Sequence, residues 1–88
     1  MKDQILSRRV KLRQLNVLLS VMQWGSMARA AEHLAVSQPV VSKTIAELES
    51  LLGVALLNRT SQGVEPTIYG SALARRSIAS VEMVLYNG

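Results

Sequence analysis

Two amphipathic helical segments separated by a very short break constrain the fold of this chain more than any other feature. The first segment has apolar residues on one face of a short helix: Met27, Ala30, Ala31 and Leu34. Ala30 and Ala31 are small, and small side chains let two helices approach closely at a steep angle, as a helix-turn-helix requires. Ala35 and Val36 follow as the turn, so the sequence predicts a helix-turn-helix.

The helix after this turn is predicted to run from Ser37 to about Leu52. Ser37 suits the N-cap, and Pro39 falls in the first turn, where a missing N–H costs nothing. One narrow arc of the helix is apolar and predicted to be buried: Val41, Ile45, Leu48 and Leu52. The opposite side carries small and polar residues and one cation, which suits contact with another surface: Pro39, Ser42, Lys43, Ala46 and Ser50.

A further helix is predicted before this pair, between Lys11 and Gln23, with Trp24 and Gly25 ending it. Its expected apolar row is Leu15, Leu18, Leu19 and Met22. Ser26 is the expected N-cap of the second helix. Trp24 is expected to fill space in the core.

The region after Gly53 reads as a β-hairpin. We expect strands at residues 54–57 and 64–65, joined by a polar turn at 58–63, with Pro66 ending the pairing because it cannot donate to a ladder. Thr67 then caps a long helix to about Tyr86. The predicted fold is mainly α: a winged helix-turn-helix with a three-helix core, a short β-hairpin wing and a long C-terminal linker helix.

Composition limits the function. With 88 residues the chain forms one small domain, and without cysteine and with a single histidine it offers no metal set, so no cofactor is expected. An enzyme is disfavoured, since the one aspartate, Asp3, lies near the N-terminus and His33 has no evident catalytic partners. The formal charge of +4 suits a polyanionic partner, while 3% aromatic residues give too few platforms for single-stranded nucleic acid.

Residues 1–10 are expected to be a flexible basic arm ahead of a domain at 11–66 and a linker helix at 67–88. The basic residues that begin the chain could lie along phosphates: Lys2, Arg8, Arg9, Lys11 and Arg13. The apolar run after them is shorter than a signal-peptide core and far shorter than a membrane span. We therefore expect a cytoplasmic protein.

The sequence from Leu15 to Gly70 resembles the DNA-binding domain of LysR-type transcriptional regulators. The segments that carry the resemblance are Gly25-Ser26-Met27, Arg29-Ala30-Ala31-Glu32-His33-Leu34, Val36-Ser37-Gln38-Pro39-Val40-Val41-Ser42-Lys43, Leu48-Glu49, Leu52-Gly53, Leu56-Leu57 with Arg59, and Gly63-Val64. It departs from the usual family pattern at Met27, Pro66, Ile68 and Tyr69. The resemblance implies contacts to bases and phosphates along the third helix and pairing through the linker helix.

In this interpretation the third helix enters the major groove of double-stranded DNA. The candidate base-reading residues are Gln38, Pro39, Val40, Ser42 and Lys43. The candidate backbone contacts are Ser26, Arg29, Ser37, Arg59, Ser61 and Gln62, with residues 59–62 as the wing tip. For Arg59, an ion pair with a carboxylate such as Glu49 is an open alternative.

A homodimer on an inverted-repeat operator is expected, because one half-site offers few base contacts. The predicted dimerisation row on the linker helix is Ala74, Ile78, Val81 and Leu85, which a monomer would leave uncovered. The resemblance further implies that an effector-binding domain is missing here, so that a small-molecule inducer would act only through that domain. The alternative function is a winged-helix module for protein–protein interaction without specific DNA binding.

Overall fold

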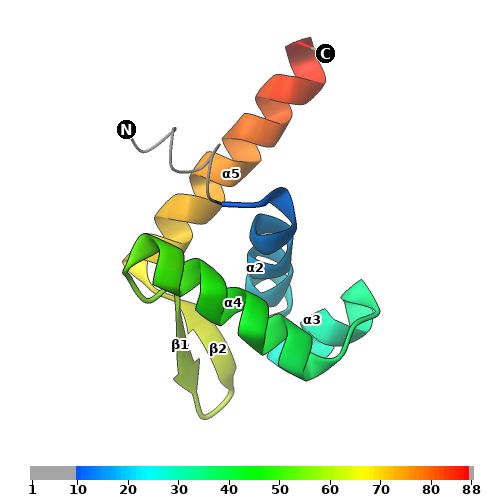
Figure 1. The fold of residues 1–88 in the computed structure, drawn as a ribbon, viewed down its shortest axis with the longest axis vertical. Helices are drawn as coiled ribbons and strands as arrows, with labels where there is room; N and C mark the ends of the chain where they lie inside the picture. Colours follow the sequence, from blue (N-terminus) through cyan, green and yellow to red (C-terminus); the bar gives the residue numbers. More distant parts are fainter. Residues whose placement is uncertain (1–9, 88) are drawn as a thin grey trace.

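The structure, a computed structural model, describes the backbone of residues 10–87 and the side chains of residues 10–77. Four helices and a two-stranded antiparallel sheet follow one another along the described chain (Figure 1): α2 (Leu12–Trp24), α3 (Met27–Leu34), α4 (Gln38–Leu52), β1 (Leu57–Thr60), β2 (Gly63–Pro66) and α5 (Ile68–Asn87). The predicted winged helix-turn-helix with a following long helix is confirmed.

Helix α2 lies at the centre of the packing, since it contacts α3, α4, α5 and β2. Two of its residues, Leu18 and Val21, are completely buried. The expected apolar row is only partly correct: Leu15, Leu19 and Met22 are half-buried, whereas Gln14, Val17 and Ser20 are buried. A helix with neighbours on several sides buries more than one face, so a single apolar stripe does not locate its core positions.

The turn between α3 and α4 is built as the sequence predicts. Ser26 Oγ accepts a hydrogen bond from the Arg29 amide, and α3 ends at Ala35, whose φ of 58° places it in the left-handed region. That conformation is unusual for a residue with a Cβ. The Ala35 amide donates to the carbonyls of Ala31 and Glu32, which closes the end of α3.

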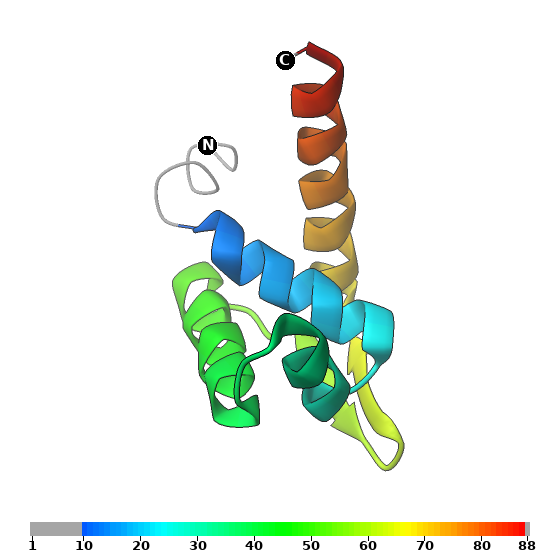
Figure 2. The ribbon, with the colours of Figure 1, turned by 90° about the vertical axis from the view of Figure 1, so that its right-hand side faces the viewer.

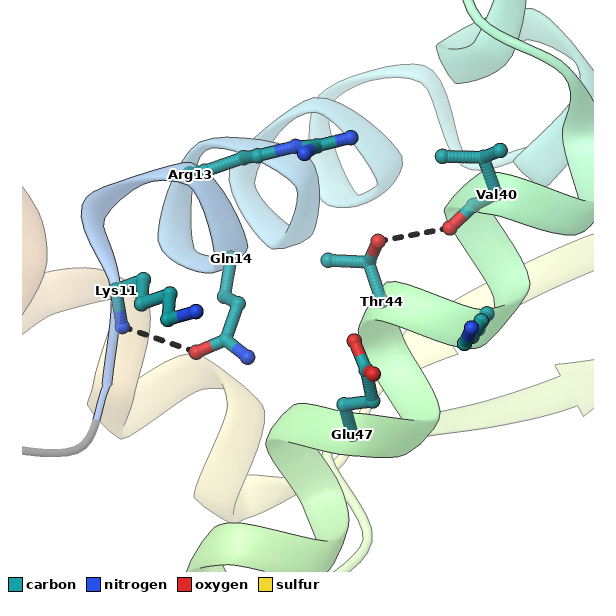
Figure 3. Close-up of a pocket in the computed structure, with 7 residues that line it drawn as sticks. Lys11, Arg13, Gln14, Val40, Thr44 and Glu47 are labelled. Carbon is teal, nitrogen blue, oxygen red and sulfur yellow. Dashed lines mark hydrogen bonds between the residues drawn. The ribbon is translucent and has the colours of Figure 1, made fainter.

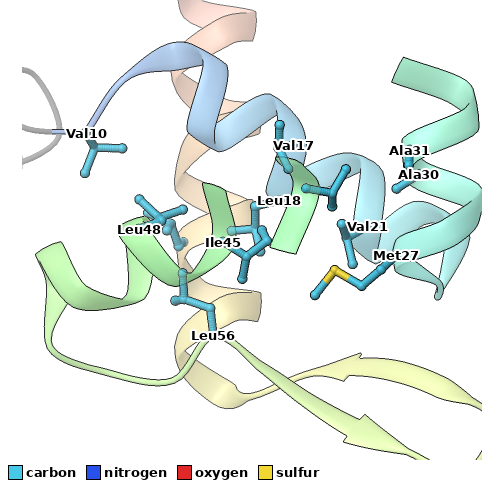
Figure 4. Packing of buried hydrophobic residues seen from close by; sticks show 12 residues of the cluster. Val10, Val17, Leu18, Val21, Met27, Ala30, Ala31, Ile45, Leu48 and Leu56 are labelled. Carbon is cyan, nitrogen blue, oxygen red and sulfur yellow. The ribbon is translucent and has the colours of Figure 1, made fainter. Parts of the chain in front are cut away.

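Close packing between α2, α3 and α4 forms most of the core (Figure 4). Ala30 and Ala31 are buried on α3, and Val41, Ile45 and Leu48 are buried on α4, as expected. Leu52 is only half-buried, and Thr44 takes an additional buried place. Its hydroxyl donates to the Val40 carbonyl at 2.8 Å, which satisfies the polar group without an outside partner.

The wing is shifted along the sequence relative to the prediction. Strand β1 begins at Leu57, so residues 54–56 lie outside the ladder, and the Leu56 side chain enters the core. The carboxylate of Glu49 accepts hydrogen bonds from the amides of Leu56 and Leu57, at 2.8 and 3.3 Å, so this segment is bonded to α4. The loop is only Ser61 and Gln62.

The placement of Arg59 at the wing tip is therefore wrong. Arg59 lies within β1 and pairs with Val64 across the hairpin, while Thr60 pairs with Gly63 next to the loop. The alternative ion pair with Glu49 is also absent from the described residues, since that carboxylate is engaged by backbone amides.

A backbone contact ties the wing to the end of α2. The Val64 amide donates to the Gly25 carbonyl at 3.1 Å. Gly63 lies beside this contact with φ of 139°, and a Cβ there would overlap the same carbonyl oxygen. Only glycine meets both requirements, the open conformation and the close backbone approach.

Helix α5 begins as predicted, with Thr67 Oγ1 accepting from the Gly70 amide. Its first half packs on α2 and β2 and buries Leu73, Ala74 and Ser77. The expectation that Ala74 belongs to an uncovered row is wrong, because the chain itself covers this residue. The side chains of Ile78, Val81 and Leu85 lie outside the described residues.

The N-terminal boundary and Trp24 also differ from expectation. Val10, assigned to the arm, is buried in the core cluster, while residues 1–9 lie outside the described part of the chain. Trp24 is 40% exposed and lies against His33, with ring centroids 5.5 Å apart, so it does not fill the core.

We expect Glu49→Ala to lower the free energy of unfolding by about 1–3 kcal/mol, because two part-buried amides lose a charged acceptor. Glu47→Ala is the matched control, since Glu47 lies on the same helix and is exposed. Urea denaturation of both variants measures the difference. Equal losses in the two variants would show that the Glu49 contacts contribute nothing.

Gly63→Ala is expected to destabilise the fold by about 1–3 kcal/mol through backbone strain and the clash with Gly25. Gly53→Ala is the control: Gly53 also has a positive φ, of 71°, but a Cβ there meets open space. Its cost should be limited to about 1 kcal/mol. Thermal denaturation in parallel compares them, and a Gly63 variant as stable as the Gly53 variant contradicts the expectation.

Candidate nucleic-acid interface

The first turn of α4 is capped by Ser37 and exposed to solvent. Ser37 Oγ accepts a hydrogen bond from the Val40 amide at 3.4 Å, and Ser37 itself is exposed. Gln38 and Pro39 are exposed in this turn as well. The positive end of the helix dipole therefore lies beside a polar side chain at the surface.

The exposed side of α4 has a simple composition. Pro39, Lys43 and Ala46 are exposed, whereas Val40 and Ser42 are half-buried at its two edges. We call the five candidate base-reading residues the α4 front: Gln38, Pro39, Val40, Ser42 and Lys43. This surface combines hydrogen-bonding groups, small apolar groups and one cation, with no large aromatic or aliphatic anchor.

The start of α3 offers a second candidate contact. Ser26 is half-buried because its hydroxyl caps the helix, and the Arg29 side chain is exposed. Arg29 also lines a surface hollow of about 380 Å³ together with Trp24, Glu32 and His33. Arg29 is thus available to a ligand at the side of this hollow.

On the wing, Arg59, Ser61 and Gln62 are all exposed. The Gln62 amide donates to Thr60 Oγ1 at 3.2 Å, which tightens the loop and leaves the Gln62 side chain outside this bond. Arg59 projects from a strand, so its backbone is held by the ladder while its guanidinium reaches solvent.

The two views of the ribbon place the start of α4 and the wing tip at one end of the molecule (Figures 1 and 2). The C-terminal end of α5 lies at the opposite end. The fold therefore gathers the α4 front and the wing loop at one end and keeps the C-terminal half of the predicted linker helix away from them.

Two of the basic residues that begin the chain lie on the folded domain, within the predicted bounds of 11–66. Lys11 precedes α2 and its amide donates to Gln14 Oε1 at 2.9 Å, while Arg13 lies in the first turn of α2. Both line a groove of about 300 Å³ against α4 (Figure 3). The helix predicted between Lys11 and Gln23 already placed Arg13 in the domain, and α2 agrees with it.

Comparison with known sequences decides the family. The sequence profile described as "Bacterial regulatory helix-turn-helix protein, lysR family" matches residues 12–71. The chain belongs to the LysR family. The matched residues form a LysR-type DNA-binding domain, and the family is one of transcriptional regulators and not of enzymes. The resemblance drawn from the sequence is confirmed.

Curated relatives agree with this assignment. The transcriptional regulator PcaQ of Agrobacterium fabrum is 43% identical over 88% of this chain, and the uncharacterised regulator YdcI of Escherichia coli is 37% identical over 94%. These alignments cover 25% and 27% of the relatives, so the chain spans about a quarter of their length.

Solved structures share the fold. The CbnR_DBD–DNA complex is similar with a TM-score of 0.80 at 37% identity, covering 89% of this chain and 90% of that one. The complex of BenM_DBD with catB site 1 DNA has a TM-score of 0.78 at 34% identity, covering 84% and 83%. None of the helices in the described part of the chain combines the length and the hydropathy that a membrane span requires.

Proposed function

We propose that this LysR-type domain binds double-stranded DNA sequence-specifically as a homodimer, with α4 in the major groove of an inverted-repeat operator. The observation that carries the proposal is the α4 front, an exposed surface of small and polar residues on the helix that follows the turn. A major groove about 12 Å wide admits a helix whose outer residues are small. The solved DNA complexes of CbnR_DBD and BenM_DBD support this use of the fold.

The chemistry of the α4 front suggests how bases are read. Gln38 can pair with adenine through N6 and N7, and Lys43 can donate to O6 and N7 of guanine. Pro39 and Val40 offer apolar contact to a thymine methyl group, and the Ser42 hydroxyl suits either a donor or an acceptor. Gln38 and Lys43 are the exposed polar members, so they carry most of the proposed readout.

Backbone contacts are assigned to the elements around the front. Ser37 and the Gln38 amide at the start of α4 suit a phosphate, as do Ser26 and Arg29 at the start of α3. On the wing, the proposed contacts come from Arg59, Ser61 and Gln62. With about four phosphates neutralised per subunit, log K falls with log salt at a slope of roughly −3.6.

Dimerisation supplies the discrimination that one domain lacks. Two or three base contacts, at about 1–3 kcal/mol each, give limited selectivity in a single half-site. In the sequence, Ile78, Val81 and Leu85 form an apolar row on α5 with the spacing of one helix face. Pairing of two such helices about a two-fold axis places two α4 helices on an inverted repeat.

Properties of a whole regulator are further proposals. The relatives are about four times as long as the matched region, which agrees with a separate effector-binding domain outside this sequence. We propose that an inducer acts through that domain and that the protein works in the cytoplasm, where its DNA lies. A winged-helix module that binds only protein is disfavoured, since such a surface needs large apolar anchors that the α4 front lacks.

Selectivity is measured as the affinity for a duplex selected from random sequences divided by the affinity for an unselected duplex. Gln38→Ala should lower this ratio by about 5- to 100-fold, because a bidentate base contact is lost. Gln23→Ala is the control, since Gln23 is exposed on α2. Fluorescence anisotropy measures both ratios. An unchanged ratio for the Gln38 variant removes this residue from the readout, and no binding of any duplex at low salt overturns the proposed function.

Val81→Glu should shift the protein from dimer towards monomer, because a charge in an apolar row cannot be buried without a partner. Met83→Glu adds the same charge two residues further along the sequence, off the predicted row, and should leave the dimer intact. Sedimentation velocity at several concentrations compares the variants. If both proteins remain dimeric, the interface lies elsewhere.

A further inference from the structure

The short segment that leads from α4 into the wing is bonded on both of its sides. The Leu56 amide donates to the Glu49 carboxylate of α4 at 2.8 Å, and the Leu56 side chain is buried in the core. On the other side, the Leu56 carbonyl accepts a hydrogen bond from the Thr67 amide at 3.0 Å. Thr67 stands directly before α5, so Leu56 joins the helix that carries the α4 front to the start of the long helix.

The Thr67 hydroxyl adds a second bond at this place. It donates to the Ala55 carbonyl at 2.6 Å and accepts from the Gly70 amide at 3.1 Å, so its proton and an acceptor position are both used. Capping of α5 needs only the bond to Gly70. The bond to Ala55, 12 positions earlier in the chain, joins two different parts of the fold. We call the four residues Ala55, Leu56, Thr67 and Gly70 the α5 joint.

Close backbone packing leaves the α5 joint little room to move. Gly70 is buried in the first turn of α5, and a Cβ there would overlap the Leu56 carbonyl oxygen. The first half of α5 also packs on α2 and β2, whereas its C-terminal half projects beyond the core (Figures 1 and 2). The direction of α5 is therefore set over its first half, beginning at the joint.

A small tilt at the joint becomes a large displacement at the far end of α5. The helix has 20 residues, which at about 1.5 Å per residue gives a length of about 30 Å. A tilt of about 10° at its start would move its end by about 5 Å, more than the rise of about 3.4 Å between base pairs. In the proposed dimer two α5 helices pair, so the direction of α5 relative to α4 sets the distance between the two α4 helices.

We propose that the α5 joint sets the spacing of the half-sites that the dimer accepts, with Thr67 as the positioning residue. The inference rests on the proposed function, because it concerns two copies of the domain on one duplex. The α4 front reads the bases of each half-site, and Thr67 fixes how far apart the two fronts lie. Its role is thus selectivity for operator geometry, separate from selectivity for base sequence.

Four variants separate the joint from the cap. Thr67→Val removes both bonds of the hydroxyl, and Thr67→Ser keeps both. Thr67→Asp retains an acceptor for the Gly70 amide but has no proton for the Ala55 carbonyl. Ser77→Ala is the matched control, because Ser77 is a buried hydroxyl on the same helix that donates to the Leu73 carbonyl of that helix.

The probes are two labelled duplexes with the inverted repeat selected from random sequences, one unchanged and one with a base pair inserted between the half-sites. Fluorescence anisotropy with the full 88-residue chain gives the ratio of the two affinities. Thr67→Val and Thr67→Asp should lower this ratio by about 2- to 10-fold, the factor that corresponds to one hydrogen bond of ordinary strength. Thr67→Ser and Ser77→Ala should keep it. A loss of stability alone would weaken binding to both duplexes equally and leave the ratio unchanged.

A distance measurement tests the joint without DNA. The chain has no cysteine, so Ser50→Cys, at an exposed position of α4 outside the α4 front, carries a single spin label in each subunit. Double electron–electron resonance on the dimer gives the distance between the two labels. Thr67→Asp should shift or broaden the distance distribution by about 5 Å, the displacement that a tilt of about 10° produces, whereas Thr67→Ser should not.

The outcomes separate this inference from the function on which it rests. If Thr67→Asp keeps both the affinity ratio and the distance distribution, the inference is wrong and the proposed function stands; this variant decides alone if Thr67→Val does not fold. An equal loss in Ser77→Ala also overturns the inference. If the unmodified chain binds both duplexes equally, no spacing is selected and the inference fails while DNA binding stands. Failure to bind any duplex at low salt removes the proposed function together with the inference.

Discussion

The close approach of α3 to the other two core helices is the constraint on which the rest of the structure depends. It is possible because Ala30 and Ala31, both buried, occupy the contact. With the left-handed Ala35 ending α3, this packing sets the direction in which α4 leaves the turn. The buried arc of α4 faces the core as a result, and its small and polar residues face outward. A larger side chain in place of Ala30 would tilt α4 and alter which residues are presented.

Polar contacts, in addition to the packing of the core, position the wing. The Glu49 carboxylate bonds the segment before β1 to α4, and the Gly25 carbonyl bonds β2 to the end of α2. The first contact bridges the connection between α4 and β1, and the second joins segments far apart in the chain. Both hold backbone amides, so together they fix the position of the wing relative to the helices. The elements that would surround a bound duplex are therefore held in register with α4 by the same groups that stabilise the fold.

In the proposed function, the cations contribute affinity and the shape and polar groups of the α4 front contribute selectivity. The net charge of +4 is spread over the surface, with Arg29, Arg59, Lys43 and the Lys11–Arg13 pair on different elements around α4. Such contacts hold a duplex without reading it. In the proposed function, the few groups of the α4 front read the bases, and a second copy of the domain supplies the remaining selectivity.

The sequence alone determined the helices, their caps and the turn, since these depend on residues three or four positions apart: Ser26, Gly25, Ser37 and Thr67 all act as predicted. It also identified the exposed α4 front and the LysR resemblance. Tertiary structure decided the rest. The α2 core face, the start of β1 at Leu57 and the position of Arg59 depend on Glu49, Gly25 and the several neighbours of α2. The burial of Ala74, the exposure of Trp24 and the placement of Lys11 and Arg13 beside α4 likewise follow from contacts between segments far apart in the chain. Local spacing cannot encode such contacts, because they exist only once the helices have packed.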